Sequence, residues 1–243
     1  MSKNYELLSR VAGRGQVLLE QNNAASLNPR RMGSCFPTNA EIVRLASSIY
    51  FSPRPVPAAL AVIGVHKGCG ATWISARLAQ NLAARTTRSV CILDCNGEDP
   101  AVQRYPGNVE QYAPWEEGPL YSEDPRQIAQ LILGDNLWLV GWRSASIGKR
   151  QSMLSEECRT MINVLRRKFD YVIADGAPIT QDESIGSLGP QLDGAILVVE
   201  ACVTRRSAVL KARETLDAAC TPLLGTILNK KTSPLPPFIS AWL

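Results

Sequence analysis

Residues 61–73, Ala61-Val-Ile-Gly-Val-His-Lys-Gly-Cys-Gly-Ala-Thr-Trp73, combine an apolar run, a glycine-bearing turn and the start of a helical pattern. In a phosphate-binding loop, G-x-x-x-x-G-K-[ST], backbone N–H groups hold the phosphates, the lysine neutralises their oxygens and the Ser/Thr binds Mg²⁺. Here Gly70 and Thr72 stand at the expected positions, whereas Ala71 occupies the lysine position and the first glycine is displaced to Gly64. The stretch therefore predicts a phosphate-binding loop without its lysine.

Apolar runs and helical patterns alternate after this loop. We expect strands at 59–65, 89–94, 136–141, 171–175, 195–199 and 223–228, and helices at 72–84, 125–133, 152–168 and 205–219. Unbroken Val, Ile and Leu runs are typical of strands that are covered on both faces. The order predicts an α/β fold with a doubly wound, mostly parallel sheet. Such sheets bind ligands at the carboxyl ends of their strands, where the loop at Gly68 is expected.

Composition restricts the class of protein. The chain has 243 residues, 45% of them hydrophobic, which suffices for one sizeable core. A net charge of +4 is too small for a nucleic-acid-binding surface. Seven cysteines without a C-x-x-C pair, and a single histidine, indicate reduced thiols in the cytoplasm and no histidine-based metal site. No apolar run approaches the roughly 18 residues of a membrane helix, so we expect membrane contact only through a partner.

Changes in composition divide the chain into four parts. These are a mobile leader (1–37), a helix with a proline-rich connector (38–57), the main domain (58–232) and a proline-rich tail (233–243). The leader carries a short amphipathic helix pattern at 2–12, and packing of this helix on its own domain stays open as an alternative. Thr38-Asn-Ala-Glu41 predicts a capping box at the start of the second part. Residues 96–124 have little periodicity, which is typical of a functional or mobile loop.

Two aspartates end predicted strands. Asp94 closes Cys91-Ile-Leu-Asp94, and Asp175 closes Val172-Ile-Ala-Asp175. In a nucleotide site, carboxylates at these positions hold the water shell of Mg²⁺ and position an attacking water or hydroxyl. A single aspartate at a strand end more often caps a turn, but two in the expected order favour a nucleotide site. Asn229 ends the last predicted strand and offers a donor and an acceptor to a purine edge, with a turn residue as the alternative.

Four side chains in or beside the loop have two interpretations each. Lys67 could swing toward the phosphates in place of the missing lysine, but a solvated loop lysine is the simpler interpretation. His66 could be a catalyst, but we expect a turn residue, because no acidic partner adjoins it. Cys69 could be a reactive thiolate, since N–H groups and a helix N-terminus lower a thiol pKa, although a packing role is preferred. Trp73 could stack on another group, but we expect it to plug the helix onto the sheet.

The order of these motifs resembles the deviant-Walker P-loop ATPases, and most of all the bacterial tyrosine kinases of capsule and exopolysaccharide biosynthesis (CpsD/CapB-like). The likeness covers roughly residues 38–232 and implies a P-loop NTPase-like fold with ATP or ADP and Mg²⁺ as cofactors, weakened by Ala71. It also implies catalytic roles for Asp94 and Asp175, which with Thr72 would bind the metal. The residues implied to hold the nucleotide are Gly68, Cys69, Gly70, Ala71, Thr72, Trp73 and Asn229.

Several positions depart from that family's pattern. Asn96 and Glu98 stand where the resemblance implies an acidic residue and an arginine. No tyrosine follows Tyr171, so phosphorylation of a C-terminal tyrosine cluster is not expected. The helix before the main domain matches only part of that family's oligomerisation pattern. Whether the chain forms a homo-oligomer is therefore left open. The matching residues are Glu41 and Arg44, and the departing ones are Ser47 and Ile49.

Three functional hypotheses follow. The first is a kinase-like regulatory or scaffold protein of capsule or exopolysaccharide biosynthesis and export, with weak or no enzymatic turnover. It would be cytoplasmic and held at the inner membrane by a chain-length-control membrane protein of the export complex. The second is an active ATP-dependent protein tyrosine kinase or ATPase with an unconventional loop. The third is a membrane-associated positioning ATPase anchored through residues 1–12.

Overall fold

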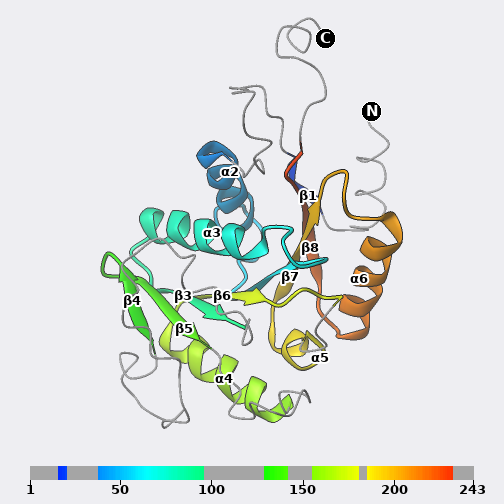
Figure 1. Cartoon of the computed structure of the whole chain (residues 1–243). Helices are drawn as coiled ribbons and strands as arrows, with labels where there is room; N and C mark the ends of the chain where they lie inside the picture. The colour runs from blue at the N-terminus through cyan, green and yellow to red at the C-terminus, as the bar shows by residue number, and fades with distance from the viewer. Residues whose placement is uncertain (1–15, 21–37, 96–128, 142–154, 181–184, 232–243) are drawn as a thin grey trace, which may run out of the picture.

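A computed structural model describes residues 16–20, 38–95, 129–141, 155–180 and 185–231 (Figure 1). Its elements are, in chain order, β1 (Gln16–Glu20), α2 (Asn39–Tyr50), β2 (Ala59–Gly64), α3 (Ala71–Arg85), β3 (Val90–Asp94), β4 (Gln130–Leu133), β5 (Leu137–Gly141), α4 (Ser155–Lys168), β6 (Tyr171–Gly176), α5 (Ile185–Leu188), the 3-10 helix η3 (Gly189–Gln191), β7 (Gly194–Glu200), α6 (Arg206–Ala218) and β8 (Leu223–Asn229).

The strands form one sheet in the order β1-β8-β7-β2-β6-β3-β5-β4. Every neighbouring pair is parallel except β4 and β5, which are antiparallel. The strand β2, which leads into the glycine loop, lies between β7 and β6 in the middle of the sheet. The predicted doubly wound, mostly parallel α/β fold is therefore confirmed.

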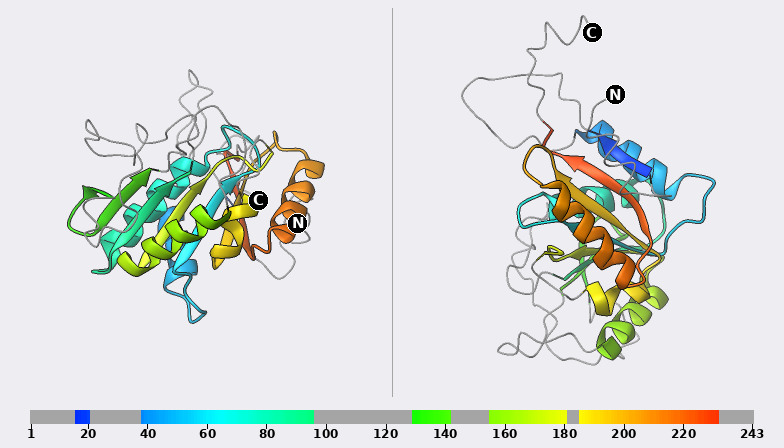
Figure 2. Two further views of the ribbon diagram at one scale, coloured as in Figure 1. Left: turned by 90° about the horizontal axis from the view of Figure 1, so that it is seen from below. Right: turned by 90° about the vertical axis from the view of Figure 1, so that its right-hand side faces the viewer.

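Helices cover both faces of the sheet. Figures 1 and 2 show α2 and α3 on one face and α4, α5 and α6 on the other. In β3, Val90 and Ile92 pack into the core beneath α2 and α3, while Cys91 and Leu93 pack into the opposite core. All residues of β2 and β3 are buried, as expected for strands covered on both sides. No helix in the described part of the chain is both long and apolar enough to cross a bilayer.

The capping box at the start of α2 is confirmed. The Glu41 N–H donates to Thr38 Oγ1 at 3.4 Å, and the Thr38 N–H donates to Glu41 Oε2 at 2.7 Å. At its other end, α2 is tied to α3, because Arg85 donates to the Ser47 hydroxyl at 2.8 Å and lies over the Phe51 ring. These contacts fix α2 beside the helix that begins at the loop.

All six predicted strands are present, each with ends within one residue of the prediction. The helix predicted at 125–133 is wrong in its described part, because residues 130–133 form β4, and residues 125–128 lie outside the described residues. An apolar run this short does not separate helix from strand by periodicity. Gly134, with φ of 56°, turns the chain so that β4 pairs antiparallel with β5.

The leader contains a strand that was not predicted. Residues Gln16–Glu20 form β1, which pairs parallel with β8. The helix expected at 2–12, the loop at 96–124, the departures Asn96 and Glu98, and the tail at 233–243 lie outside the described residues. The division of the chain into four parts remains a prediction.

Candidate functional site

The glycine loop joins the end of β2 to the start of α3. Gly68 and Gly70 adopt φ angles of 89° and 95°, which residues with a Cβ rarely adopt. A Cβ at Gly70 would also collide with the amide nitrogen of Asn229. Gly70 is the N-cap of α3 and Ala71 its first residue, so the first N–H groups of the helix lie at the loop. This arrangement has the backbone features of an anion-binding turn.

The two predicted aspartates lie side by side. Asp94 of β3 and Asp175 of β6 are direct partners in the register of the sheet, and their exposures are 3% and 0%. The Ser75 hydroxyl of α3 donates to Asp175 Oδ1 at 3.2 Å. Because Val62 of β2 is also a register partner of Asp175, both carboxylates end strands at the same edge as the loop. The structure thus brings together the strand-end residues that the sequence singled out.

The oxygen donors at this edge fit a hard cation. Thr72 is half-buried in the first turn of α3, one turn before the serine that contacts Asp175. In the described residues, no group of three or more His, Cys, Asp or Glu side chains is placed to hold a metal ion. Mg²⁺ is usually held by one or two carboxylates together with water and substrate phosphates. Thr72, Asp94 and Asp175 offer oxygen donors of the kind that such a nucleotide-bound Mg²⁺ takes.

Asn229 lies behind the loop with its side chain fully buried. Its Nδ2 donates to the Cys69 carbonyl at 2.7 Å, and its Oδ1 accepts from the Lys230 N–H at 2.9 Å. In this conformation the Asn229 amide positions the loop. To contact a purine edge, the amide would have to break these two hydrogen bonds and form new ones with the base.

The thiol of Cys69 packs inside the loop. The residue is 1% exposed, and its Sγ donates to the His66 carbonyl at 2.9 Å. Burial raises the pKa of the Cys69 thiol above its usual value, despite hydrogen bonds with the backbone that act to lower it. The reactive-thiolate interpretation is therefore not supported, and packing is. Trp73 is half-buried against the core beneath α2 and α3, with the Arg77 guanidinium 5.5 Å from its ring, as expected for a plug.

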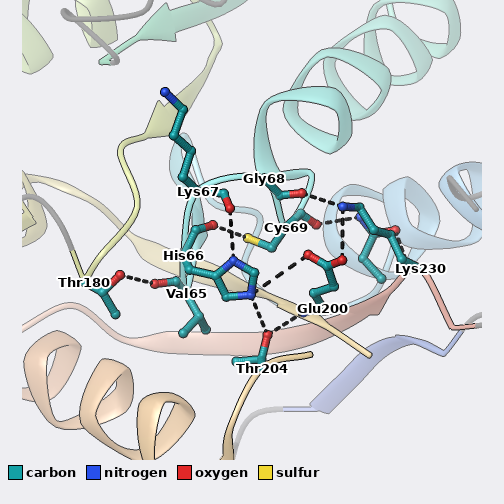
Figure 3. Close-up of polar contacts among 10 residues, drawn as sticks. Val65, His66, Lys67, Gly68, Cys69, Thr180, Glu200, Thr204 and Lys230 are labelled. Atoms are coloured by element: carbon teal, nitrogen blue, oxygen red, sulfur yellow. Dashed lines mark hydrogen bonds and ion pairs between the residues drawn. The ribbon is translucent and has the colours of Figure 1, made fainter. Parts of the chain in front are cut away.

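A cluster of polar side chains that the sequence did not reveal lies against the loop (Figure 3). Lys230, just after β8, donates from Nζ to the Gly68 carbonyl at 2.6 Å and pairs with Glu200 Oε1 at 3.2 Å. His66 Nε2 lies 2.9 Å from Thr204 Oγ1 and 4.0 Å from Glu200 Oε2. The expectation that His66 has no acidic neighbour is therefore wrong, because β7 ends beside the loop and brings Glu200 to it.

The missed residues carried a usable signal. Glu200 ends β7 and is the register partner of Asn229, which ends β8. The strand-end reasoning that identified the two aspartates applies equally to Glu200 and Lys230. Lys67, by contrast, is exposed, and its side chain points away from Glu200 and Lys230 (Figure 3).

Comparisons with known proteins agree with the resemblance seen in the sequence. The chain is 36% identical over 70 residues to the tyrosine-protein kinase CpsD of Streptococcus agalactiae, which covers 29% of this chain and 31% of that protein. It is 30% identical over 96 residues to the tyrosine-protein kinase CpsD of Streptococcus pneumoniae, covering 40% and 42%. The matched segments thus span less than half of either relative. No protein-family model matches the chain.

Solved structures show the same fold along most of the chain. The chimerical protein CapA2B2 aligns with a TM-score of 0.72 and 19% identity over 94% of this chain and all (100%) of that one. The kinase domain of the Escherichia coli tyrosine kinase ETK aligns with a TM-score of 0.70 and 15% identity, covering 97% and 98%. At these identities the structures establish the fold alone. With the curated relatives, they confirm the likeness to the CpsD/CapB-like bacterial tyrosine kinases and the P-loop NTPase-like architecture.

Proposed function

We propose that this chain is a kinase-like regulatory or scaffold protein of bacterial capsule or exopolysaccharide biosynthesis and export, with little or no catalytic turnover. One observation carries the proposal: Ala71 opens α3 directly behind Gly70, in a loop that otherwise has the backbone of an anion site. The retained loop and the paired Asp94 and Asp175 support nucleotide binding, and the missing lysine argues against fast phosphoryl transfer. The names of the curated relatives and the kinase-domain fold support the biological setting.

ATP or ADP with Mg²⁺ is the ligand that this site fits. The loop and the first turn of α3 would hold the phosphates through N–H groups, while Thr72, Asp94 and Asp175 would hold the metal and its water shell. Bound Mg²⁺ would neutralise charge on the phosphates. A charge-assisted contact to phosphate contributes roughly 1.5 to 3 kcal/mol to binding, and loss of such a contact weighs more in a transition state that accumulates charge. Loss of the lysine at position 71 therefore weakens binding less than it slows turnover.

The proposed partner is a chain-length-control membrane protein of a polysaccharide export complex, which would hold the chain at the cytoplasmic face of the inner membrane. Assembly through the helix α2 is less well supported. The Ser47 hydroxyl already donates to the Val43 carbonyl and accepts from Arg85 of the same chain, and Ile49 is buried. Both side chains are thus engaged within the chain, which argues against a homo-oligomer contact through these two residues.

A second candidate, an active ATPase or tyrosine kinase, is favoured by one observation. The Lys230 ammonium lies 2.6 Å from the Gly68 carbonyl, so the loop has a cation beside it although residue 71 is alanine. This candidate differs from the first in rate of turnover and not in the location of the site.

Calorimetric titration with MgADP and MgATP, followed by a hydrolysis assay, tests the proposal. We expect saturable binding with hydrolysis at background, and hydrolysis above background in Ala71→Lys. Wild-type hydrolysis that Asp175→Ala abolishes would show an active enzyme and refute the first candidate. Absence of nucleotide binding would refute the nucleotide-binding part of the proposal. A pull-down with the membrane protein would then decide the scaffold role.

A further inference from the structure

The carbonyl side of the loop is held by two consecutive residues at one strand end. Asn229 donates to the Cys69 carbonyl at 2.7 Å, and Lys230 Nζ donates to the Gly68 carbonyl at 2.6 Å. In a planar trans peptide, the C=O of one residue and the N–H of the next point in opposite directions. Holding these two carbonyls outward therefore turns the N–H groups of Cys69 and Gly70 toward the inside of the loop. There the Cys69 N–H donates to the His66 carbonyl at 3.4 Å, a long hydrogen bond that it would exchange for a phosphate oxygen.

Lys230 is itself held in place from several directions. Its backbone N–H donates to Asn229 Oδ1, and its ammonium pairs with Glu200 in a contact where both side chains are less than one-fifth exposed, at 18% and 16%. Its φ of 56° lies in the left-handed region, which residues other than glycine adopt at an energetic cost. This turn directs the side chain back over the loop, where the Gly68 contact and the ion pair offset the cost.

Glu200 connects the loop to the turn between β7 and α6 as well. The Glu200 N–H donates to Thr204 Oγ1 at 3.0 Å, and the same hydroxyl lies 2.9 Å from His66 Nε2. In addition to the Asn229 contact at Cys69, the loop is therefore held by Lys230 at Gly68 and by Thr204 at His66 (Figure 3). The last two contacts depend on the position of Glu200.

We propose that Lys230, held by Glu200, is the positioning residue that allows this loop to bind the phosphates of a nucleoside diphosphate or triphosphate although Ala71 supplies no cation. The inference rests on the proposed function and adds a residue to its site. Lys230 acts from the carbonyl side, where it fixes the peptide between Gly68 and Cys69 and places positive charge behind the inward N–H groups. Lys67 lies on the exposed part of the loop and points away from this cluster, so it serves as the comparison position.

Two measurements on the full chain test this role. Lys230→Met should weaken MgADP binding in calorimetry by about tenfold, which corresponds to loss of one charge-assisted hydrogen bond. Glu200→Gln should weaken binding in the same direction by a smaller factor. In the nucleotide-free protein, Lys230→Met should speed amide hydrogen exchange in the peptide 66–73 by at least roughly fivefold, because the loop loses its anchor. The control Lys211→Met, at an exposed position of α6, should change neither measurement.

Each result decides between defined outcomes. The inference is overturned if Lys230→Met matches the wild type in both affinity and exchange, or if Lys67→Met weakens MgADP binding as much as Lys230→Met does. A general loss of structure is recognised by a lowered melting temperature and faster exchange in peptides far from the loop. If the wild type binds no MgADP, nucleotide binding as a function fails. The phosphate-binding role of Lys230 fails with it, and loop exchange in Lys230→Met then decides only whether Lys230 anchors the loop: faster exchange supports that anchoring, and unchanged exchange overturns it as well.

Discussion

Replacing Asn229 by alanine tests how the loop is held. The substitution removes the donor to the Cys69 carbonyl and the acceptor of the Lys230 N–H, and the site is fully buried. Each internal hydrogen bond contributes roughly 0.5 to 1.5 kcal/mol, and a buried group left without a partner costs about 1 to 3 kcal/mol. We therefore expect the free energy of unfolding to fall by about 2 to 4 kcal/mol.

Urea denaturation followed by tryptophan fluorescence measures this loss. The midpoint should fall while the slope of the transition stays constant, because the surface exposed on unfolding is nearly unchanged. Asn81→Ala is a matched control, since Asn81 donates only a 3.2 Å hydrogen bond to the Arg77 carbonyl within α3. We expect it to cost less than about 0.5 kcal/mol. A loss at Asn229 no larger than that of the control would refute the claim that this side chain holds the loop.

Three further substitutions test other parts of the fold. Gly70→Ala should lower stability by roughly 1 to 3 kcal/mol in thermal denaturation, because φ is 95° and the added Cβ has no room, whereas Gly186→Ala, with open space around it, should be neutral. Asp193→Asn should flatten the fall in stability at acid pH. Burial acts to raise the pKa of Asp193, but hydrogen bonds from backbone N–H groups and Arg166 outweigh burial, so the pKa of Asp193 is lowered in the folded protein. The contribution of Asp193 to the free energy of unfolding is therefore complete above the unfolded-state pKa of about 3.9, and it is lost as the pH falls through the folded-state pKa. An equally steep acid transition in the variant would contradict this. Asn136→Ala should speed amide exchange at the end of α3 and cost about 1 to 3 kcal/mol, because Asn136 Nδ2, which carries two N–H donors, lies 2.9 to 3.1 Å from the backbone carbonyls of Ala83, Thr86 and Arg88.

The sequence predicted the parts of the fold that depend on local patterns. Central strands are covered on both faces, so they appear as continuous apolar runs, and their ends mark the positions of Asp94 and Asp175. The capping box at Thr38 is equally local, since both partners lie within one helical turn. The sheet edge was harder to predict, because four residues of β4 contain too little periodicity to distinguish strand from helix.

The contacts of the loop could not be predicted in the same way. Lys230 and Glu200 reach the loop only because β8 and β7 are neighbours and β7 lies next to β2. No local pattern indicates that a lysine after one strand will donate to a glycine carbonyl after another. Strand-end position narrows the candidates, as it did for Asp94, but the partner of each side chain depends on the order of strands in the sheet.

The anchoring of the loop from β8 has an evolutionary consequence. The shape of the loop depends on Gly70, Asn229 and Lys230, while residue 71 contributes a side chain that none of these contacts uses. A substitution at position 71 therefore leaves these anchoring contacts in place. Selection can act on the charge carried by residue 71 separately from selection on the shape of the loop.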